Sequence, residues 1–490
     1  MEGHGPSGGE PSRDRPAARN AASAARRARL LLVALVAVGL VARLGLALAM
    51  PEERAAWAPE AWAYLKLGRS LAAGDGLAMP ADLLADESAA AGRDGGAESP
   101  GPAHAQPRLA ARMPGYPLLV AACERLSERG VRLLAIVQSL FGAAAMGLAA
   151  YLAWRLAARR KGAAETLVGP ACAWAAAAAA ALLTFDPYQV YACAVVLPVV
   201  PLGFMLLAAT GAGLEFLEVS RQGGRAWPWA ALAGLALAAA AYLDWRMAGL
   251  APVLGLAALV APGRRRYLVG WAAGLAVMAL VLAPWLVRNA VVLGSPVLTT
   301  DVGARLLEGA DGAADPGLDP AGRSESAALS DPAGRTEPAA EAARPPSWRG
   351  SARGLSEAAR DGACLRSALR RIGADPARWL GVVARRAAAI WSPWPAPEHR
   401  SLPLPPVAGY TSLLPTAVLA LGGVWALRRR PAELAWLLAL PLVATAAAAV
   451  LAGGVEDRLP VGPVLAVLGG VGLAAAVARP GEKAAPGAGR

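Results

Sequence analysis

The sequence contains few of the residues that usually build metal sites and nucleophilic centres. Only three histidines and four cysteines occur among its 490 residues, and no two cysteines form a CxxC pair. We therefore expect no histidine-based zinc site, no catalytic triad and no disulfide framework. The chain also has no P-loop and no glycine-rich dinucleotide fingerprint, which argues against nucleotide hydrolysis.

Lysine is scarce as well, so arginine supplies nearly all of the cationic charge behind the formal net charge of +12. The arginine clusters stand at the ends of apolar runs. A protein that binds nucleic acid instead gathers its basic side chains into one patch or stripe. We therefore expect membrane lipids as partners, and no nucleic acid.

Long apolar runs dominate the chain, which is 56% hydrophobic. A helix of about 20 apolar residues crosses the hydrocarbon core of a bilayer. The sequence therefore predicts an all-α membrane protein with about ten transmembrane helices. The predicted spans cover residues 30–50, 131–154, 167–185, 190–214, 227–243, 247–261, 267–287, 410–427, 432–452 and 460–478.

The charge of the loops between these runs predicts the orientation of the chain. Cytoplasmic loops of membrane proteins carry an excess of lysine and arginine. Basic clusters at 26–29, 155–161, 221–225, 264–266 and 428–430 alternate with junctions that lack them. We therefore expect a multi-pass plasma-membrane protein with both termini cytoplasmic. It would consist of an arginine-rich tail at 1–29, a membrane domain at 30–478 and a second tail at 479–490.

Two long loops, 51–130 and 288–409, fall on the extracytoplasmic side under this topology. Each contains a low-complexity stretch that could bury little apolar surface, at 80–107 and 309–346. Juxtamembrane helices are predicted beside these stretches, at 57–71, within 109–126, at 356–372 and at 376–391. The first of them is amphipathic and suits the membrane interface.

Two carboxylates are candidate catalytic residues. Glu60 lies near the start of the 57–71 helix, where a carboxylate would act as general base or help to bind Mg²⁺ or Mn²⁺. The alternative for Glu60 is a solvated charge on the helix face. Asp186, like Asp244, lies at an outer helix junction, where an ionisable side chain is either functional or a simple interfacial cap.

Arginines on the outer side break the positive-inside trend and need a separate explanation. Arg112 lies in the first outer loop, and Arg246, Arg288 and Arg458 stand at outer span ends. Guanidinium groups hold phosphate oxygens through paired, charge-assisted hydrogen bonds. These four side chains are therefore candidate ligands for a lipid-linked phosphate, with lipid-headgroup contact as the alternative. Arg43, inside the first span, is expected to face a cavity or a partner carbonyl.

Several short motifs follow one another in order along the chain. PEAWAY contains Glu60 and Tyr64 and is followed by Leu71 and Gly74. RMPGYP begins at Arg112 and contains Pro114, Gly115 and Tyr116. PWLVRN contains Trp285, Arg288 and Asn289 and is followed by Gly294, Thr299, Thr300 and Gly303. DRLP, at 457–460, opens the last predicted span.

This order resembles the GT-C class of membrane glycosyltransferases, which includes protein O-mannosyltransferases and the transferases of lipid A aminoarabinose and lipopolysaccharide-core sugars. The resemblance extends over nearly the whole chain. It implies a GT-C-like fold and the transfer of a sugar from a polyprenyl-phosphate carrier, outside the cytoplasm, to a glycan, lipid or protein acceptor of the cell envelope. It also implies that Glu60 occupies the position of the catalytic acid, which is an aspartate in the family.

The sequence departs from the family pattern at a second acid. The family places that acid early in its fourth span, where this chain reads Leu197, Pro198 and Val199. Asp186 is the nearest outward carboxylate that could substitute for it. Three hypotheses follow. The first is an inverting glycosyltransferase, the second is a non-catalytic relative that serves as a scaffold in envelope-glycan assembly, and the third is a transporter of a lipid-linked substrate.

Overall fold

The computed structural model describes residues 15–56, 59–77, 110–160, 170–255, 264–311, 355–393, 404, 407–451 and 455–477. Within these ranges the chain forms helices and turns, with no β-strand, as the all-α prediction requires. The predicted low-complexity stretch 80–107 and residues 312–346 of the second lie outside the described residues, as do 1–14 and 478–490.

Seven helices of the described chain are long and apolar enough to cross a membrane, so the protein is a multi-pass membrane protein. They are α1 (Arg15–Ala49), α6 (Gly130–Arg160), α9 (Val199–Arg221), α12 (Arg264–Leu293), α19 (Val407–Leu427), α20 (Pro431–Val450) and the continuous pair η6 (Val455–Val461) and α21 (Gly462–Val477). Two further apolar helices, α7 (Pro170–Thr184) and α10 (Trp227–Leu243), are shorter. The predicted span 247–261 is described only as the end of η2 (Trp245–Gly249) and α11 (Leu250–Gly255). The number of about ten spans is thus not confirmed.

The predicted span 190–214 begins later than expected. The structure has a short helix, α8 (Pro187–Ala192), then a turn, and the long helix α9 begins only at Val199. Pro198 disfavours helical backbone in the residue before it. The backbone N–H of Val196 donates instead to the carbonyl of Ala55, which ends α2 (Glu52–Ala55), at 2.9 Å. The continuous apolar run led to the early start of the predicted span, although Pro198 marks the break.

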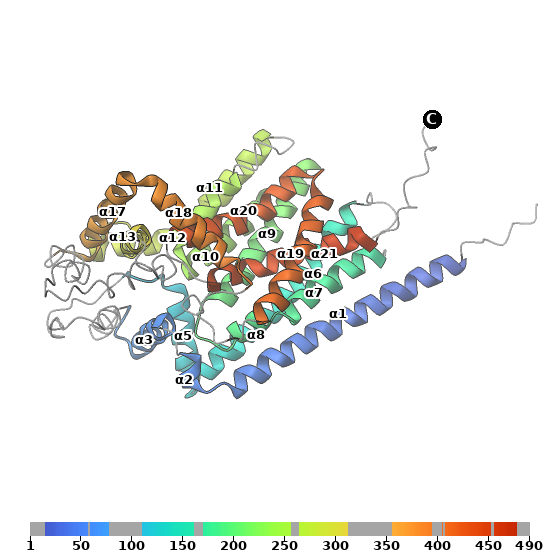
Figure 1. Cartoon of the computed structure of the whole chain (residues 1–490), viewed down its shortest axis with the longest axis horizontal. Helices are drawn as coiled ribbons and strands as arrows, with labels where there is room; N and C mark the ends of the chain where they lie inside the picture. The colour runs from blue at the N-terminus through green and yellow to red at the C-terminus, as the bar shows by residue number, and fades with distance from the viewer. Residues whose placement is uncertain are drawn as a thin grey trace, which may run out of the picture.

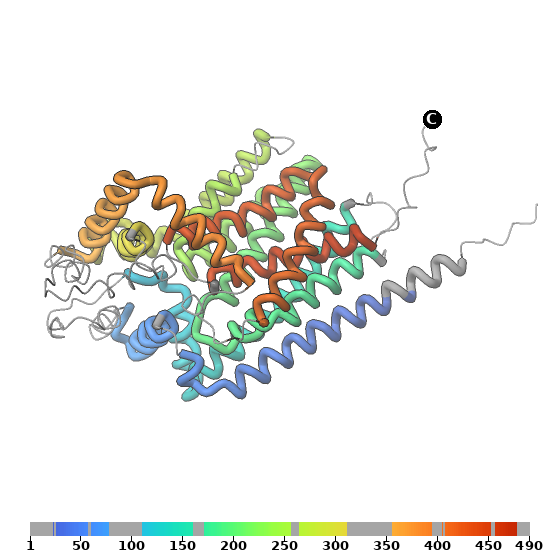
Figure 2. The backbone as a smooth tube through the Cα atoms, in the orientation of Figure 1, coloured from blue at the N-terminus to red at the C-terminus, as the bar shows by residue number. Residues whose placement is uncertain are grey.

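The apolar helices lie alongside one another, and shorter helices gather at one end (Figure 1). These are α3 (Pro59–Ala73), α5 (Gly115–Leu126), α13 (Val302–Asp311), α17 (Glu357–Ala374) and α18 (Pro376–Ile390). Figure 2 shows α1, in blue, along one side of the bundle, where it packs on α6 and α7. Small residues allow close packing, as is common between membrane helices. A Cβ atom on Gly234 of α10 would lie 2.0 Å from the carbonyl oxygen of Gly274 in α12.

Three of the basic clusters used to predict the topology meet at the other end. Helix α6 begins at Gly130, four residues after α5 ends, and extends to Arg160. Near that far end, Arg155 and Arg159 both lie 2.9 Å from the carboxylate of Glu215 in α9. The α9 and α20 clusters also join there, because the buried carboxylate of Glu433 lies 2.6 Å from Arg221 and 3.4 Å from Arg430. Arg430 in turn donates to the carbonyl of Arg159.

Candidate functional site

Glu60 lies in the first turn of α3. The helix begins at Pro59, a residue suited to the first helical position because its φ is fixed and it lacks an N–H. The helix dipole favours a carboxylate in this turn. Farther along α3, Ala61 and Tyr64 are buried and Arg69 is exposed.

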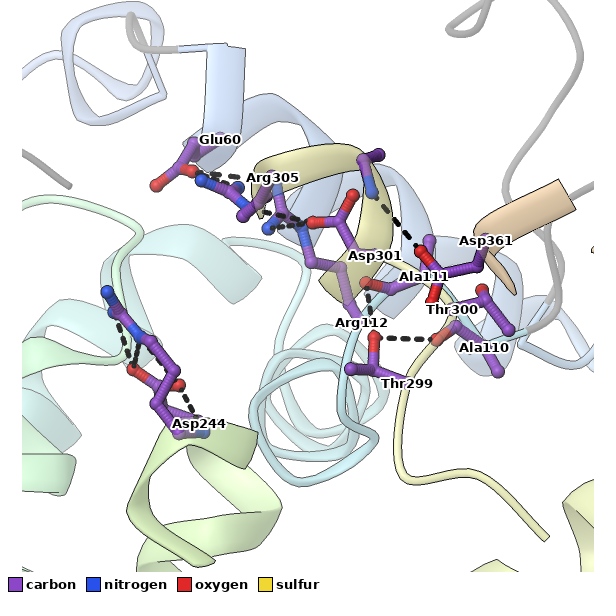
Figure 3. A network of polar contacts seen from close by, with 12 residues as sticks. Glu60, Ala110, Ala111, Arg112, Asp244, Thr299, Thr300, Asp301, Arg305 and Asp361 are labelled. Carbon is purple, nitrogen blue, oxygen red and sulfur yellow. Dashed lines mark hydrogen bonds and ion pairs between the residues drawn. The ribbon is translucent and has the colours of Figure 1, made fainter. Parts of the chain in front are cut away.

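Glu60 belongs to a cluster of four charged side chains, which we call the Glu60 cluster (Figure 3). Its Oε1 accepts a hydrogen bond of 2.7 Å from Nη2 of Arg305 in α13 and lies 3.5 Å from Nη2 of Arg112. The carboxylate of Asp301 joins the same two arginines, at 2.8 Å from Nε of Arg305 and 3.5 Å from Nη1 of Arg112. Two carboxylates and two guanidinium groups therefore alternate around one ring.

The arginines control the charge of Glu60. Burial by itself would raise the pKa of this carboxyl group, but the positive charges of Arg305 and Arg112 outweigh burial and lower the pKa to about 2. The side chain is still 41% exposed. Glu60 is therefore ionised, ion-paired and partly open to solvent at neutral pH.

The PWLVRN motif positions Arg112 through a neighbouring loop. Trp285 Nε1 donates to the carbonyl of Leu298, and Asn289 Nδ2 donates to the carbonyl of Val297, each at 2.7 Å. The loop held in this way places the hydroxyl of Thr299 3.0 Å from the carbonyl of Ala110, to which it donates. Arg112 follows two residues later. The PWLVRN motif at 284–289 thus helps to position the RMPGYP motif, which begins at Arg112.

The RMPGYP motif packs tightly against the bundle. A Cβ atom on Gly115 would lie 2.7 Å from the carbonyl oxygen of Tyr242, so no larger residue fits there without movement. Pro114 stands immediately before α5. Tyr116 is fully buried, and its hydroxyl donates to Gln138 at 2.9 Å. Its ring meets Tyr64 edge to face at 5.0 Å, and the guanidinium carbon of Arg112 lies 5.7 Å from the centroid of the Tyr64 ring.

Helix α13 brings Asp301 and Arg305 to the cluster. The carboxylate of Asp361 in α17 accepts from the backbone N–H of Gly303 at 2.7 Å and so caps the start of α13. Only glycine allows this approach, since a Cβ atom on Gly303 would lie 2.0 Å from the carbonyl oxygen of Asp361. The first turn of α13 then places Arg305 one turn after Asp301, with both side chains directed at the Glu60 cluster.

A second charged cluster centres on Arg246, in η2. Its Nη2 lies 2.6 Å from Asp244 and 2.6 Å from Asp457 of η6. Burial lowers the pKa of the guanidinium, but these two carboxylates outweigh it and raise the pKa well above its ordinary value. The charge of Arg246 also contributes to the low pKa of Glu60, so the two clusters share one electrostatic environment.

No protein-family model, curated protein or solved structure matches this chain. The GT-C resemblance therefore remains a prediction from the sequence motifs.

Asp186 and Arg458 interact electrostatically, and their hydrogen bonds in the described part of the chain are to residues outside the Glu60 cluster. Asp186 caps α8, with its carboxylate accepting from the backbone N–H of Tyr188 at 2.9 Å. Burial raises its pKa to about 6, and Arg458 is one of the groups that oppose the rise. Arg458 is buried and donates to the carbonyls of Ile390 and Ser392 at the end of α18, at 3.0 and 2.9 Å. The contacts of Asp186 are thus those of a helix cap.

Arg288 lies within the supporting motif. Its Nη1 donates to the side chain of Asn289 at 2.8 Å, and its guanidinium carbon lies 4.9 Å from the ring centroid of Trp285. Arg43 meets carbonyls, as predicted, and donates to Leu183 at 2.8 Å and to Gly39 at 3.0 Å. Of the four arginines nominated for phosphate, Arg112 alone contacts Glu60 directly.

The carboxylates of these clusters do not fit a divalent cation. Mg²⁺ and Mn²⁺ need several oxygen ligands directed at one point. Glu60 and Asp301 are each paired with arginine, as are Asp244 and Asp457. No group of three or more potential metal ligands occurs among the described residues. We therefore assign no step to a metal.

Asp301 and Arg305 were not identified from the sequence as site residues. A usable signal existed, because an acid followed by arginine four residues later forms an ion pair on one helix face. Asp301 also follows directly on Thr300, within the stretch that continues the PWLVRN motif, and Arg305 lies two residues after Gly303. Their meeting with Glu60 required the three-dimensional packing of two loops that are far apart in the chain.

Proposed function

We propose that the chain is a membrane glycosyltransferase that moves a sugar from a polyprenyl-phosphate carrier to an acceptor hydroxyl on the extracytoplasmic face of the plasma membrane. The observation that carries the proposal is the direct contact of Glu60 with Arg305 and Arg112, at 2.7 and 3.5 Å. A base candidate and two phosphate-binding candidates thus occupy one place. The gathering of three basic clusters at the other end of the bundle supports the assignment of the side.

The proposed reaction is a single displacement. The bond between the anomeric carbon and the phosphate oxygen breaks, and its electron pair stays on the phosphate. The acceptor oxygen bonds to the anomeric carbon from the opposite face, and the acceptor proton passes to Glu60. The departing polyprenyl phosphate gains one negative charge, which the guanidinium groups of Arg112 and Arg305 stabilise.

Donor binding would also activate the base. A carboxylate with a pKa of about 2 is a weak proton acceptor. Arginine forms strong bidentate hydrogen bonds with phosphate, so a bound donor competes with Glu60 for Arg305 and Arg112. Once these partners turn to phosphate, the hydrogen bond from Arg305 and the charges that favour the ionised carboxylate of Glu60 are weakened, and the pKa of Glu60 rises. Glu60 thus becomes an effective base only in the donor complex.

Binding of polyprenyl phosphate, the leaving product, tests the two arginines without knowledge of the sugar. Purified protein in nanodiscs is titrated with a short-chain polyprenyl phosphate. Arg112→Gln and Arg305→Gln are each expected to raise the dissociation constant about tenfold to a hundredfold, the usual effect of losing a hydrogen bond to a charged group. The matched control is Arg69→Gln, which removes an exposed arginine of α3 that pairs with Glu124. Unchanged affinity in both test variants would contradict the proposal.

A non-catalytic scaffold for envelope-glycan assembly is the second candidate. It is favoured by the position of Asp186, which caps α8 and so adds no second acid beside Glu60. Such a scaffold would bind polyprenyl phosphate but transfer nothing from a panel of polyprenyl-phosphate hexoses and pentoses. Transfer from any of these donors in wild-type protein, together with its loss in Arg305→Gln, would reject this candidate.

A further inference from the structure

The hairpin of α17 and α18 carries a basic surface that has no role in the proposed transfer. Five arginines of the hairpin are exposed, Arg366, Arg370 and Arg371 in α17 and Arg378 and Arg385 in α18; we call Arg366, Arg370, Arg378 and Arg385 the arginine surface. Two large apolar side chains lie on the same hairpin, Leu369 at 55% and Leu380 at 58% exposure. Figure 1 shows the hairpin along one edge of the end that also holds α3 and α13.

We propose that the arginine surface docks on anionic lipid headgroups of the leaflet at this end of the bundle, with Leu369, one helical turn after Arg366, entering the interface. Arginine side chains close to a membrane surface are attracted to anionic headgroups. The inference is independent of the glycosyltransferase proposal, since none of these residues belongs to the Glu60 cluster.

The acids of the hairpin do not neutralise the arginine surface. Glu357 accepts from the backbone N–H of Ala110 at 3.2 Å and also bonds to Thr300. Asp361 caps α13, and Asp375 caps α18 by accepting from a backbone N–H at 2.9 Å. In the described part of the chain, no carboxylate forms an ion pair with any of the four arginines.

Three other arginines at this end of the bundle are paired with carboxylates. Arg69 lies 3.2 Å from Glu124, Arg305 lies 2.7 Å from Glu60, and Arg246 lies 2.6 Å from Asp244. By contrast, Arg366 and Arg370 stand one helical turn apart, where like charges disfavour the helix. An anionic surface against α17 would remove this repulsion, so the charge pattern is complementary to a lipid headgroup layer.

The packing of α18 keeps the hairpin beside the membrane. Ile390, at the end of α18, packs in one cluster with Ala448 and Ala449 of the apolar helix α20. Arg458 fastens the same end by donating to the carbonyl of Ile390 at 3.0 Å. A helix anchored on a transmembrane helix remains next to the headgroups. These are therefore the anionic surface that the hairpin meets most readily.

A fluorescent label on α18 tests the proposal in the full-length protein. Ala384 is exposed and stands one residue before Arg385, so Ala384→Cys offers a labelling site. The four native cysteines are buried, and wild-type protein measures their background labelling. In phosphatidylcholine nanodiscs that also contain phosphatidylglycerol, the label is expected to shift to the blue and to be quenched by brominated lipid. It should stay water-exposed with phosphatidylcholine alone, and high salt should reverse the shift.

Substitution of the arginines separates charge from shape. Each arginine replaced by glutamine is expected to lower the docked-to-undocked ratio about fivefold, and replacing all four should abolish the response. Replacement by lysine should preserve it, and Arg69→Gln serves as the matched control. An equal spectrum in both lipid mixtures, or a shift that survives the four glutamines, would overturn the proposal. A shift produced by soluble polyglutamate but not by phosphatidylglycerol would also overturn it, in favour of an acidic protein partner.

Discussion

Glu60 accepts a hydrogen bond of 2.7 Å from Arg305, although 245 positions separate the two residues in the chain. Each residue lies on a short helix that follows an apolar helix, α3 after α1 and α13 after α12. The contact therefore joins the two long loops of the protein. Its presence in a variant indicates that both loops have packed correctly, which makes it a useful reference for mutational experiments.

Glu60→Gln is expected to lower sugar transfer by about a hundredfold or more, because the acceptor loses its general base. Binding of polyprenyl phosphate should be retained, since the competing carboxylate is gone and the arginines remain. Transfer is measured with reconstituted protein and a polyprenyl-phosphate sugar. Glu124→Gln is the matched control, because Glu124 of α5 is an ion-paired glutamate at the same end. Full transfer by Glu60→Gln would contradict the role of base.

The pH dependence of transfer should differ between kcat/KM and kcat. The pKa of Glu60 is about 2 in the protein without donor, so its carboxylate is ionised throughout the neutral and mildly acidic range. Since kcat/KM reports the free protein, its profile should show no acid limb from Glu60. The kcat profile reports the donor complex and should show one, because the arginines have turned to phosphate. Two flat profiles would argue against the exchange of partners.

Asp186→Asn is expected to stabilise the protein at neutral pH. Burial raises the pKa of Asp186 from 3.8 to about 6, so the folded state binds its proton more tightly than the unfolded chain. The stability contributed by this proton is present at low pH and is lost as pH rises from about 4 to about 6. Asparagine caps helices as well as aspartate does and carries no charge.

Thermal unfolding in detergent at two pH values measures this effect. The variant should exceed wild type by on the order of 1 kcal/mol near pH 7 and equal it near pH 4. The side-chain oxygen of asparagine accepts from the backbone N–H of Tyr188 as the carboxylate does, so the cap of α8 is preserved. A variant that is less stable than wild type at both pH values would show that the carboxylate of Asp186 stabilises the fold.

Gly303→Ala should weaken polyprenyl-phosphate binding although it replaces no charged residue. Its new Cβ atom would lie 2.0 Å from the carbonyl oxygen of Asp361, so α13 must shift and carry Arg305 away from Glu60. Such overpacking typically costs about 1–3 kcal/mol in stability. Gly373→Ala is the matched control on α17, where a Cβ atom meets nothing within 4 Å. Equal binding by both variants would contradict a positioning role for this contact.

Local signals in the sequence predicted the helices around the site better than the contacts within it. The 356–372 and 376–391 helices are present as α17 and α18, because Ser356 and Asp375 cap their starts and Pro376 breaks the chain between them. The start of α9 was misplaced, since its apolar run continues through the turn before Pro198.

The contacts within the Glu60 cluster could not be predicted from local sequence signals, for a different reason. Motif order identified Glu60 and Arg112, and the structure places them in contact. The approach of Arg305 depends on α13 packing against α17 through Gly303, a contact that no spacing rule encodes.

The attachment of the PWLVRN motif makes the site sensitive to bilayer thickness. Helix α12 has 30 residues, and its predicted span 267–287 is about 32 Å long, close to the roughly 30 Å of a hydrocarbon core. A bilayer of a different thickness therefore changes the tilt of the helix. Because Trp285 and Asn289 fasten the end of α12 to the loop that holds Ala110, a change in tilt moves Arg112 relative to Glu60. The lipid composition of the membrane thus influences the ionisation of the Glu60 carboxylate.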